Sequence, residues 1–299
     1  MPKETGLPQT DAQFDFSRAR RRRALSRLAN RLRGEPSDFN VILPFEEVVD
    51  ALGYRGERRL GLQVIPLDSI VGTVDRPRGF DRRFQPTSGS VRSRWERIAA
   101  AWRRGEEIPP IDVFRIGELH FVKDGHHRVS VARALGFKDL NAYVTEVQTV
   151  VGADRRITLK DLPLKSHERL FWERVPLPPE ARERIQLSDE WRYAGLAEGV
   201  EAWGFRLMQA GGTLMTREEV AETWFREEYL PVVEMLREAD LIGRGTETEA
   251  YMRVVTLRFL LLRTHEWNDD VIERLRGELA KPSWDEDTMV RQLRKELPR

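Results

Sequence analysis

Two kinds of hydrophobic pattern alternate in the middle of the chain. Short apolar runs predict strands at residues 62–71, 111–116, 119–122 and 140–147. Gly117-Glu118, between two of these runs, is typical of a hairpin turn. Apolar residues at helical spacing predict helices over 91–104 and 129–135. Because strands that alternate with helices are typical of α/β folds, we predict a small α/β domain over residues 61–150.

Helical patterns flank this central domain. A stripe of leucines and an alanine predicts a helix over 14–32, and Pro44 opens a second helix at 45–52 that Gly53 ends. Nearer the C-terminus, three Ser/Thr-x-x-Glu capping boxes predict helix starts at Thr216–Glu219, Thr246–Glu249 and Ser283–Glu286.

The fold class predicted is therefore mixed, α+β or α/β, with an α-helical domain added. The predicted parts are a basic N-terminal arm with short helices (1–60), the α/β domain (61–150) and the α-helical domain (151–299). The composition limits the classes of protein further. The sequence contains no run of about 18 apolar residues, so no membrane span is predicted, and we see no apolar signal segment at the N-terminus. The absence of cysteine excludes disulfides and thiolate metal sites. We expect a cytoplasmic protein.

Positive charge is concentrated near the N-terminus. Residues 18–33 hold eight arginines and no acid, so the rest of the chain carries −7 within a net charge of +1. This helix is predicted to contact the phosphates of DNA through Arg20, Arg21, Arg22, Arg23 and Arg27. The alternatives are a solvated or partner-binding arm and, less favoured because bulky aromatics are missing, a lipid-binding helix.

The strongest candidate site is the turn between the predicted strand at 119–122 and the helix at 129–135. Asp124, Gly125, His126, His127 and Arg128 occupy this turn. Glycine permits a positive φ, and the first amides of the helix together with Arg128 are expected to bind a phosphate. Asp124, His126 and His127 are the candidate acid–base or catalytic residues. The structural alternative makes Asp124 a helix cap and the histidines polar core.

A second candidate is the loop at residues 75–84. Its arginines (Arg76, Arg78, Arg82 and Arg83) are interleaved with Phe80 and Phe84, a composition suited to holding phosphates and stacking a base. The alternative is a solvated loop in a chain rich in arginine. For a metal, adjacent histidines usually point apart, so no protein metal site is predicted, and Mg²⁺ accompanying a nucleotide is preferred over zinc.

The segment from Asp124 to Gly136 and the order of the surrounding elements resemble the nucleotide-binding domain of the ParB/sulfiredoxin superfamily. Residues 65–70 (Ile-Pro-Leu-Asp-Ser-Ile) resemble its opening strand, and the arginine-rich loop lies where that family has its first nucleotide motif. The resemblance covers residues 62–147 and implies binding of CTP or ATP, with Mg²⁺ as an accompanying ion. Histidine versions of the turn are more similar to sulfiredoxin and small-molecule kinase relatives than to partition CTPases.

The chain also departs from this pattern. His126 replaces the glutamate of the Gly-Glu-Arg-Arg turn of partition proteins, and the catalytic cysteine of sulfiredoxin is missing, which excludes sulfinic acid reduction. Gly56-Glu57-Arg58-Arg59 has the same sequence as the partition motif, but it precedes the first predicted strand, so we interpret it as a coincidental match. No helix-turn-helix matches the DNA-reading domain of that family, and the helical stretch from Thr216 to Tyr251 leaves a variant of it open.

We therefore predict a nucleotide-binding regulator or DNA-associated switch that holds phosphates at the turn from Gly125 to Arg128. The first alternative is a phosphotransferase or nucleotide hydrolase that uses His126 or His127. The second is an interaction scaffold that binds no nucleotide. The sequence leaves open whether the chain forms a homo-oligomer.

Overall fold

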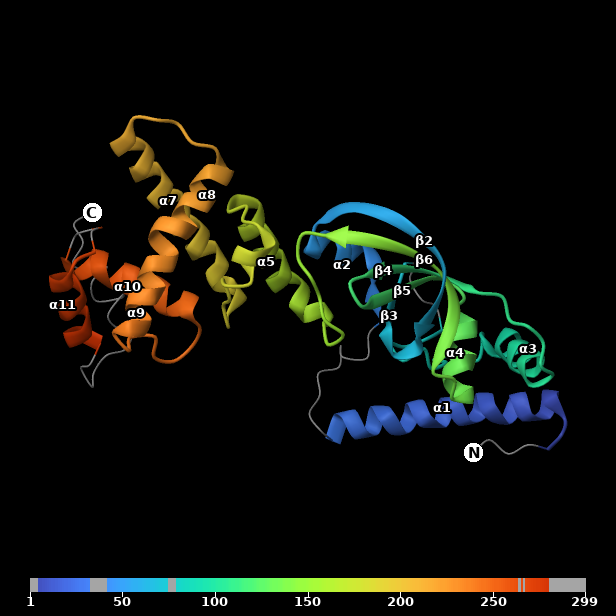
Figure 1. The fold of residues 1–299 in the computed structure, drawn as a ribbon. Helices are drawn as coiled ribbons and strands as arrows, with labels where there is room; N and C mark the ends of the chain where they lie inside the picture. Colours follow the sequence, from blue (N-terminus) through green and yellow to red (C-terminus); the bar gives the residue numbers. More distant parts are fainter. Residues whose placement is uncertain (1–4, 33–41, 75–78, 263–264, 266, 280–299) are drawn as a thin grey trace. The chain divides into compact units, whose positions relative to one another are not determined.

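The protein is described by a computed structural model that covers residues 5–32, 42–74, 79–262, 265 and 267–279. It is a mixed α/β structure that divides into two compact units, Met1–Arg169 and Leu170–Arg299. The first unit holds a six-stranded sheet with its flanking helices, and the second is built from helices (Figure 1). In the described part of the chain, no helix has the length and apolarity needed to cross a membrane.

The sheet of the first unit has the strand order β1-β3-β5-β4-β6-β2. Its strands are β1 (Leu43–Pro44), β2 (Tyr54–Pro66), β3 (Ile70–Thr73), β4 (Ile111–Ile116), β5 (Leu119–Asp124) and β6 (Asp139–Thr149). The β4–β5 and β2–β6 pairs are antiparallel, and the other neighbours run parallel. The β4–β5 hairpin turns at residues 117–118, which confirms the predicted turn.

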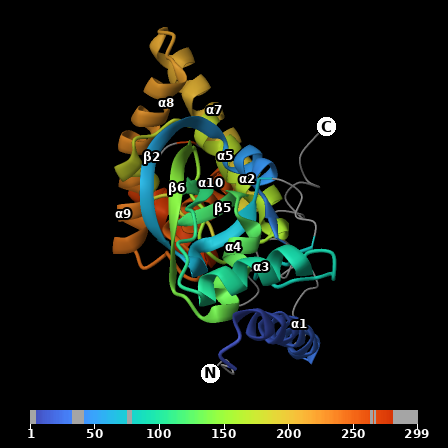
Figure 2. The same ribbon diagram turned by 90° about the vertical axis from the view of Figure 1, so that its right-hand side faces the viewer.

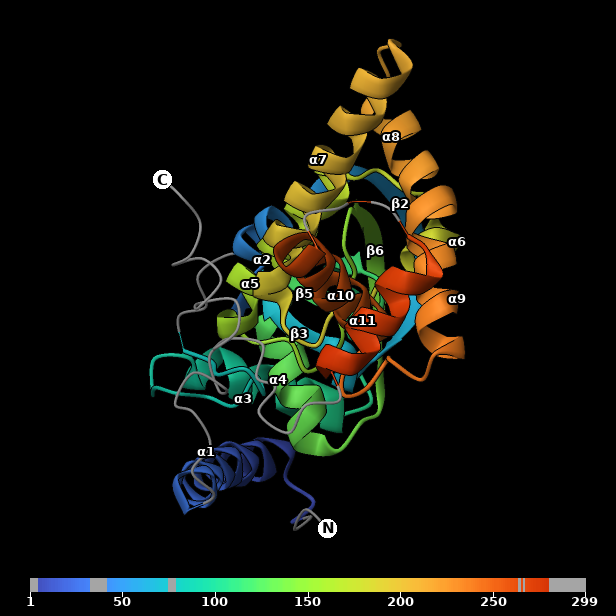
Figure 3. The ribbon, with the colours of Figure 1, turned by 90° about the vertical axis from the view of Figure 1, so that its left-hand side faces the viewer.

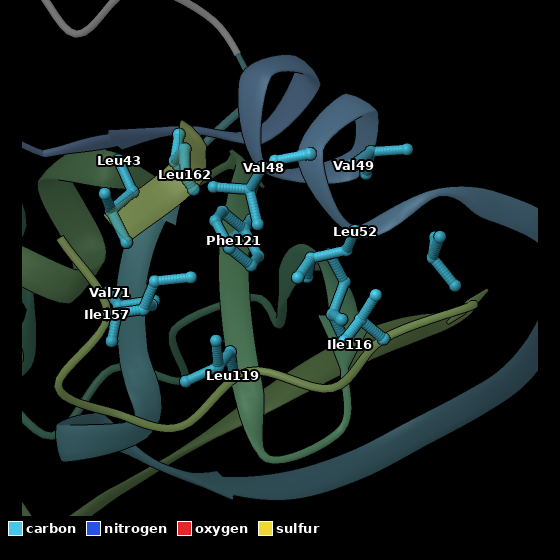
Figure 4. Packing of buried hydrophobic residues seen from close by; sticks show 13 residues of the cluster. Leu43, Val48, Val49, Leu52, Val71, Ile116, Leu119, Phe121, Ile157 and Leu162 are labelled. Atoms are coloured by element: carbon cyan, nitrogen blue, oxygen red, sulfur yellow. The ribbon is translucent and has the colours of Figure 1, made fainter. Parts of the chain in front are cut away.

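Alternate residues of β5 point into two separate hydrophobic clusters, one on each face of the sheet. Leu119 and Phe121 pack with α2 (Phe45–Leu52), in a cluster that also takes in Ile157 and Leu162. Figure 4 shows Phe121 among the side chains that α2 contributes to this cluster. Val122 faces the opposite cluster, beneath α4. The central strands are therefore buried on both faces, as their continuous apolar sequence requires.

Helix α4 (His126–Leu135) is buried on two sides. Val129 and Ala132 pack onto the sheet, whereas Val131 packs into a third cluster formed with α1 (Pro8–Leu32) and α3 (Arg92–Arg103). Figures 1 and 2 both show α1 along the α3 and α4 side of the unit. The apolar run predicts this helix at 129–135, but it begins three residues earlier, at His126. The apolar pattern misses the first turn because the residues of that turn are polar.

The basic N-terminal helix is folded onto the rest of the first unit. Phe16 meets the Trp95 ring edge-on at 5.5 Å between centroids. Arg103 of α3 pairs with the buried carboxylate of Asp15 at 2.7 Å and lies 3.8 Å from Asp11. Two acids on one face of α1 therefore fix the helix to α3 and leave arginines on the opposite side for solvent.

The strand predicted at residues 62–71 is two strands joined by a 3₁₀ turn. Strand β2 ends at Pro66, residues Leu67–Ser69 form the turn, and β3 begins at Ile70. The turn forms because Ser69 Oγ donates a hydrogen bond to the carbonyl of Pro66 at 2.6 Å. The sequence pattern does not show that the strand is interrupted, because the residues on both sides of the turn are apolar.

Strand β2 also begins at Tyr54, eight residues earlier than predicted. The sequence Gly56-Glu57-Arg58-Arg59 therefore lies inside the first long strand instead of preceding it, which corrects that part of the prediction. The strand lies at the edge of the sheet, paired with β6, and most of its residues are exposed. No regular alternation of apolar and polar residues marks it, because most of its side chains remain exposed.

The second unit is an assembly of helices (Figure 3). They are α6 (Pro179–Arg182), α7 (Tyr193–Gly211), α8 (Arg217–Trp224), α9 (Leu230–Glu238), α10 (Glu247–Leu262) and α11 (Asp269–Leu279), preceded by α5 (Leu162–Arg174), which begins in the first unit. A π-helical segment, Phe225–Tyr229, joins α8 to α9. The capping boxes at Thr216 and Thr246 are confirmed by reciprocal hydrogen bonds. The box predicted at Ser283 lies outside the described residues.

Candidate phosphate-binding site

The turn from β5 into α4 leaves the helix amides without a side-chain cap. Gly125 is the N-cap residue, with φ 109°, and a glycine at this position supplies no side chain to cap the helix. These amides carry the positive end of the helix dipole. The turn therefore has the positive-φ glycine before the helix that the sequence predicted.

Glycine is required at this turn for packing as well as for conformation. A Cβ atom at Gly125 would lie 2.4 Å from Cγ2 of Ile111 and 2.9 Å from its Cβ. In addition, φ 109° is a conformation that residues with a side chain rarely adopt. The absence of a side chain lets β5 turn into α4 directly over β4.

Arg128 does not point toward an anion at the helix start, as its position in the sequence suggested. Its guanidinium donates to the carbonyls of Pro109, at 2.9 Å, and Pro110, and it pairs with Asp124. The physical reason is that Asp124 and Arg128 are four residues apart, on the same face of this turn, beside two proline carbonyls. Arg128 therefore fixes the residues that lead into β4, and its charge is largely neutralised by groups of the protein itself.

His126 is fixed by a hydrogen bond to a residue that the sequence analysis missed. Its Nε2 lies 2.6 Å from Oγ1 of Thr73, and the threonine hydroxyl donates to the carbonyl of Val122 at 3.1 Å. Since the only hydroxyl proton is used there, Nε2 of His126 is the donor to Thr73. The ring also stacks on Phe84 at 6.0 Å between centroids. Only the parallel pairing of β3 with β5, which sets Thr73 opposite Val122, brings this threonine to the site.

His127 is a neutral imidazole at physiological pH. Burial and the nearby Arg94 and His126 lower its pKa to about 4. The ring meets the edge of Phe80 at 5.1 Å between centroids. A neutral ring at the start of a helix both donates and accepts hydrogen bonds, and an anion bound beside it would raise this pKa.

The predicted arginines of the loop lie at a different place from the turn. Arg82 donates to the carbonyl of Ile157 at 2.6 Å, and Arg83 is exposed. Both line a cavity on the other side of Phe84, so they do not join Gly125 to Arg128 in one site. Arg76 and Arg78 lie outside the described residues.

The arginines of α1 also separate into two groups. Arg20, Arg21 and Arg22 are exposed, whereas Arg23 is half-buried and its Nε pairs with Asp81 at 3.2 Å. The side chain of Arg27 lies outside the described part of the chain. Among the residues that the structure describes, no three histidine or carboxylate side chains gather in a way that would hold a metal ion.

A further histidine, His120, lies buried in β5. Its Nδ1 is 2.8 Å from Oγ of Ser69, whose hydroxyl donates to Pro66, so Nδ1 is the donor. Its Nε2 is buried with no hydrogen-bond partner in the described structure. Burial, assisted by Arg115 and Arg155, lowers the pKa of His120 to about 4.

Comparison with known proteins adds nothing to these observations. No model of a protein family matches the chain, and a search of curated proteins finds no match. The function must therefore be argued from the residues and their geometry.

We expect Gly125→Ala to destabilise the first unit by about 2–4 kcal/mol, because it combines backbone strain with a clash against Ile111. Gly136→Ala is the matched control, since Gly136 also has a positive φ (87°) but has open space around it, and we expect it to cost about 1 kcal/mol. Urea unfolding measures both values. Equal costs for the two substitutions would contradict the packing argument, and adding Ile111→Ala to Gly125→Ala should cost less than the two single changes together.

The stability of the first unit should fall between pH 6.5 and about 4 because of His120. The folded-state pKa is lowered, so in this window the unfolded chain binds a proton that the folded chain does not. The contribution of His120 is fully present above pH 6.5, and about 3 kcal/mol of it is lost once the pH is below about 4. Urea unfolding at several pH values should give a shallower slope for His120→Gln than for the wild type. Ser69→Ala, which keeps the buried imidazole, should retain the wild-type slope.

Proposed function

We propose that the first unit binds a nucleotide and that the phosphates lie at the N-terminus of α4. The observation that carries this proposal is the uncapped start of α4, which begins at a positive-φ glycine and has an imidazole on each of its first two residues. Backbone amides at such a terminus favour a phosphate because of both their unpaired hydrogens and the helix dipole. The ParB/sulfiredoxin-like fold is part of the same proposal.

The two histidines have different parts in this proposal. His126 is held by Thr73 and packs against Phe84, so it positions the first turn of α4 over the end of β3. His127 has no such hydrogen bond to a described residue, and its low pKa leaves it available to meet a phosphate oxygen. Binding then draws a proton onto His127, so affinity should rise as the pH falls below neutrality.

A binding protein or switch fits this turn better than an enzyme does. Asp124 is paired with Arg128, and its side chain is 59% exposed. His126 is engaged by Thr73. Since general acid–base catalysis needs a donor and an acceptor placed around one reacting group, these pairings favour phosphate binding with a regulatory outcome.

Nucleoside triphosphates should raise the melting temperature of the protein. A ligand that binds only the folded state adds about 2.7 kcal/mol of stability at a hundredfold excess over Kd. The assay uses ATP, CTP, GTP and UTP, each with and without Mg²⁺. His127→Ala should weaken binding by about tenfold, the effect of one lost hydrogen bond to a charged group. His167→Ala, on α5, is the control and should bind normally.

The proposal fails if no nucleotide shifts the melting temperature under any of these conditions. It also fails if His127→Ala binds nucleotide as tightly as the wild type does. Titration in buffers of different ionisation enthalpy should show proton uptake on binding, and its absence would exclude a phosphate beside His127.

A second function, contact with nucleic acid, is favoured by the exposed side of α1. Arg20 and Arg21 lie there in the solvent, while Asp15 on the opposite side fixes the helix to Arg103. Fixed arginines on a rigid helix suit contacts with a phosphate backbone.

The double variant Arg20→Ala/Arg21→Ala should reduce the dependence of duplex DNA affinity on salt. Loss of two phosphate contacts lowers the slope of log K against log salt by about 2. Fluorescence anisotropy over a salt series measures this slope. Arg104→Ala, which changes an exposed arginine paired with Glu106, should leave it unchanged. Deletion of the whole helix is a poor test, because it also removes Phe16 from the core.

A further inference from the structure

We propose that the first unit has a second anion site, a cavity between α1 and the C-terminal half of α4 that takes a small phosphorylated molecule. This site is separate from the start of α4, and its ligand goes beyond the nucleotide proposed above. The cavity has a volume of about 730 Å³. That is within the range of pockets that bind small molecules and cofactors.

Several segments of the first unit, most of them far apart in the sequence, form the walls of this cavity. Ala19 and Arg22 come from α1, and Ser130 and Arg133 come from α4. The other walls are the 3₁₀ turn after β2, the segment 82–86 and the segment 137–139, with Arg155 at the edge. Because the sequence separates these segments, no pattern in it indicates the cavity.

Positive charge predominates in the lining. Six basic residues line the cavity, against the two acids Asp68 and Asp139; the basic residues are Arg22, Arg82, Arg83, Arg133, Lys138 and Arg155. Asp68 already has a partner, since it pairs with Arg155 at 3.3 Å. An excess of cations in a partly enclosed space strengthens the attraction for an anion.

Three of these basic side chains have no carboxylate partner among the described residues. All three are exposed: Arg22 lies on α1, Arg83 in the loop before α3, and Lys138 directly before β6. They converge on one opening without forming an ion pair with any described acid. An anion of the ligand would supply that partner, and guanidinium groups bind phosphate oxygens with two hydrogen bonds.

On the inner wall of the cavity, the charged side chain of Arg133 lies over the ring of Phe84. The guanidinium of Arg133 lies 5.3 Å from the centroid of Phe84 and donates to the carbonyls of Leu67 and of Ile70, the latter at 2.8 Å. Burial lowers the pKa of Arg133 to about 10, so the group remains charged at neutral pH. Phe84 has φ 55°, a strained conformation for a bulky residue, and the surrounding loop holds it there.

The lining also contains apolar surface, which decides between a small molecule and a nucleic acid. Leu67, Val71, Phe84 and Phe137 contribute to the walls. A nucleic-acid backbone would meet the charges on an open surface and would not fill a partly enclosed space with apolar walls. An organic phosphate fits both features, because its ester part can lie on Leu67 and Phe137 while its phosphate meets the arginines.

Phe84 separates this cavity from the start of α4. One face of its ring stacks on His126, at 6.0 Å, and Arg133 lies 5.3 Å from its centroid. Gly125, His127 and Arg128 do not line the cavity. A variant at His127 therefore tests one site, and a variant at the cavity rim tests the other.

Trp102 gives a local signal for binding in the cavity. Its ring stacks on Phe137, a wall residue, at 4.8 Å between centroids. The experiment labels the full chain with 5-fluorotryptophan, assigns the Trp102 fluorine resonance with Trp102→Phe, and titrates with glucose 6-phosphate, inorganic pyrophosphate, unphosphorylated glucose or duplex DNA. We expect saturable shifts with the two phosphorylated probes and none with glucose.

Variants show whether the cations of the rim hold the ligand. Arg83→Glu/Lys138→Glu should weaken the binding of glucose 6-phosphate by at least about tenfold, because charge-assisted hydrogen bonds are lost and repulsion is added. Both residues are exposed, so the fold should tolerate the changes. Arg20→Glu/Arg21→Glu is the matched control, with the same change of charge on exposed residues outside the cavity, and should bind normally.

The proposal is overturned if neither phosphorylated probe shifts the Trp102 resonance, or if only duplex DNA shifts it. It is also overturned if the rim variant and the control variant lose the same affinity for glucose 6-phosphate. The start of α4 is tested separately by His127→Ala. That variant should keep the Trp102 shift whether or not nucleotide binding is confirmed, so failure of one proposal is distinguishable from failure of the other.

Discussion

The close approach of Gly125 to Ile111 is the constraint on which the first unit depends. At this point β5 must turn directly into α4, and a side chain of any size would overlap the neighbouring strand. The same glycine is the N-cap residue of α4 and supplies no side chain to cap its first amides. The packing of α4 over β4 and the candidate binding site at the start of α4 therefore both depend on Gly125, so a substitution there affects both.

Charged residues in this unit serve two different purposes. Arg103 and Arg128 are tied to acids and carbonyls of the protein itself, and they fix α1 and the entry to β4. Arg22 and Arg83, in contrast, stand at the rim of a cavity without a carboxylate partner in the described structure. Because ion pairs inside the protein use up charge, the arginines that remain unpaired are the better guide to where an external anion binds.

Phe84 lies between two different environments around α4. The start of the helix offers amides and the neutral imidazole of His127, whereas its C-terminal half faces guanidinium groups. Both environments favour oxyanions, although for different reasons: directional hydrogen bonds at the first and concentrated charge at the second. The strained φ of Phe84 shows that the loop 79–86 is held firmly between them.

The sequence by itself determined the local elements, the strand-to-helix turn at Gly125 and the concentration of arginine in α1. These depend on neighbouring residues: helix periodicity, capping boxes and a glycine between a strand and a helix. It did not determine that β2 continues to Tyr54, because an exposed edge strand has no hydrophobic alternation. Only the tertiary structure decided the partners of the charged and polar groups. Arg128 binds proline carbonyls, Thr73 meets His126, and Arg22 and Arg133 line one cavity, because only the folded chain brings these segments together.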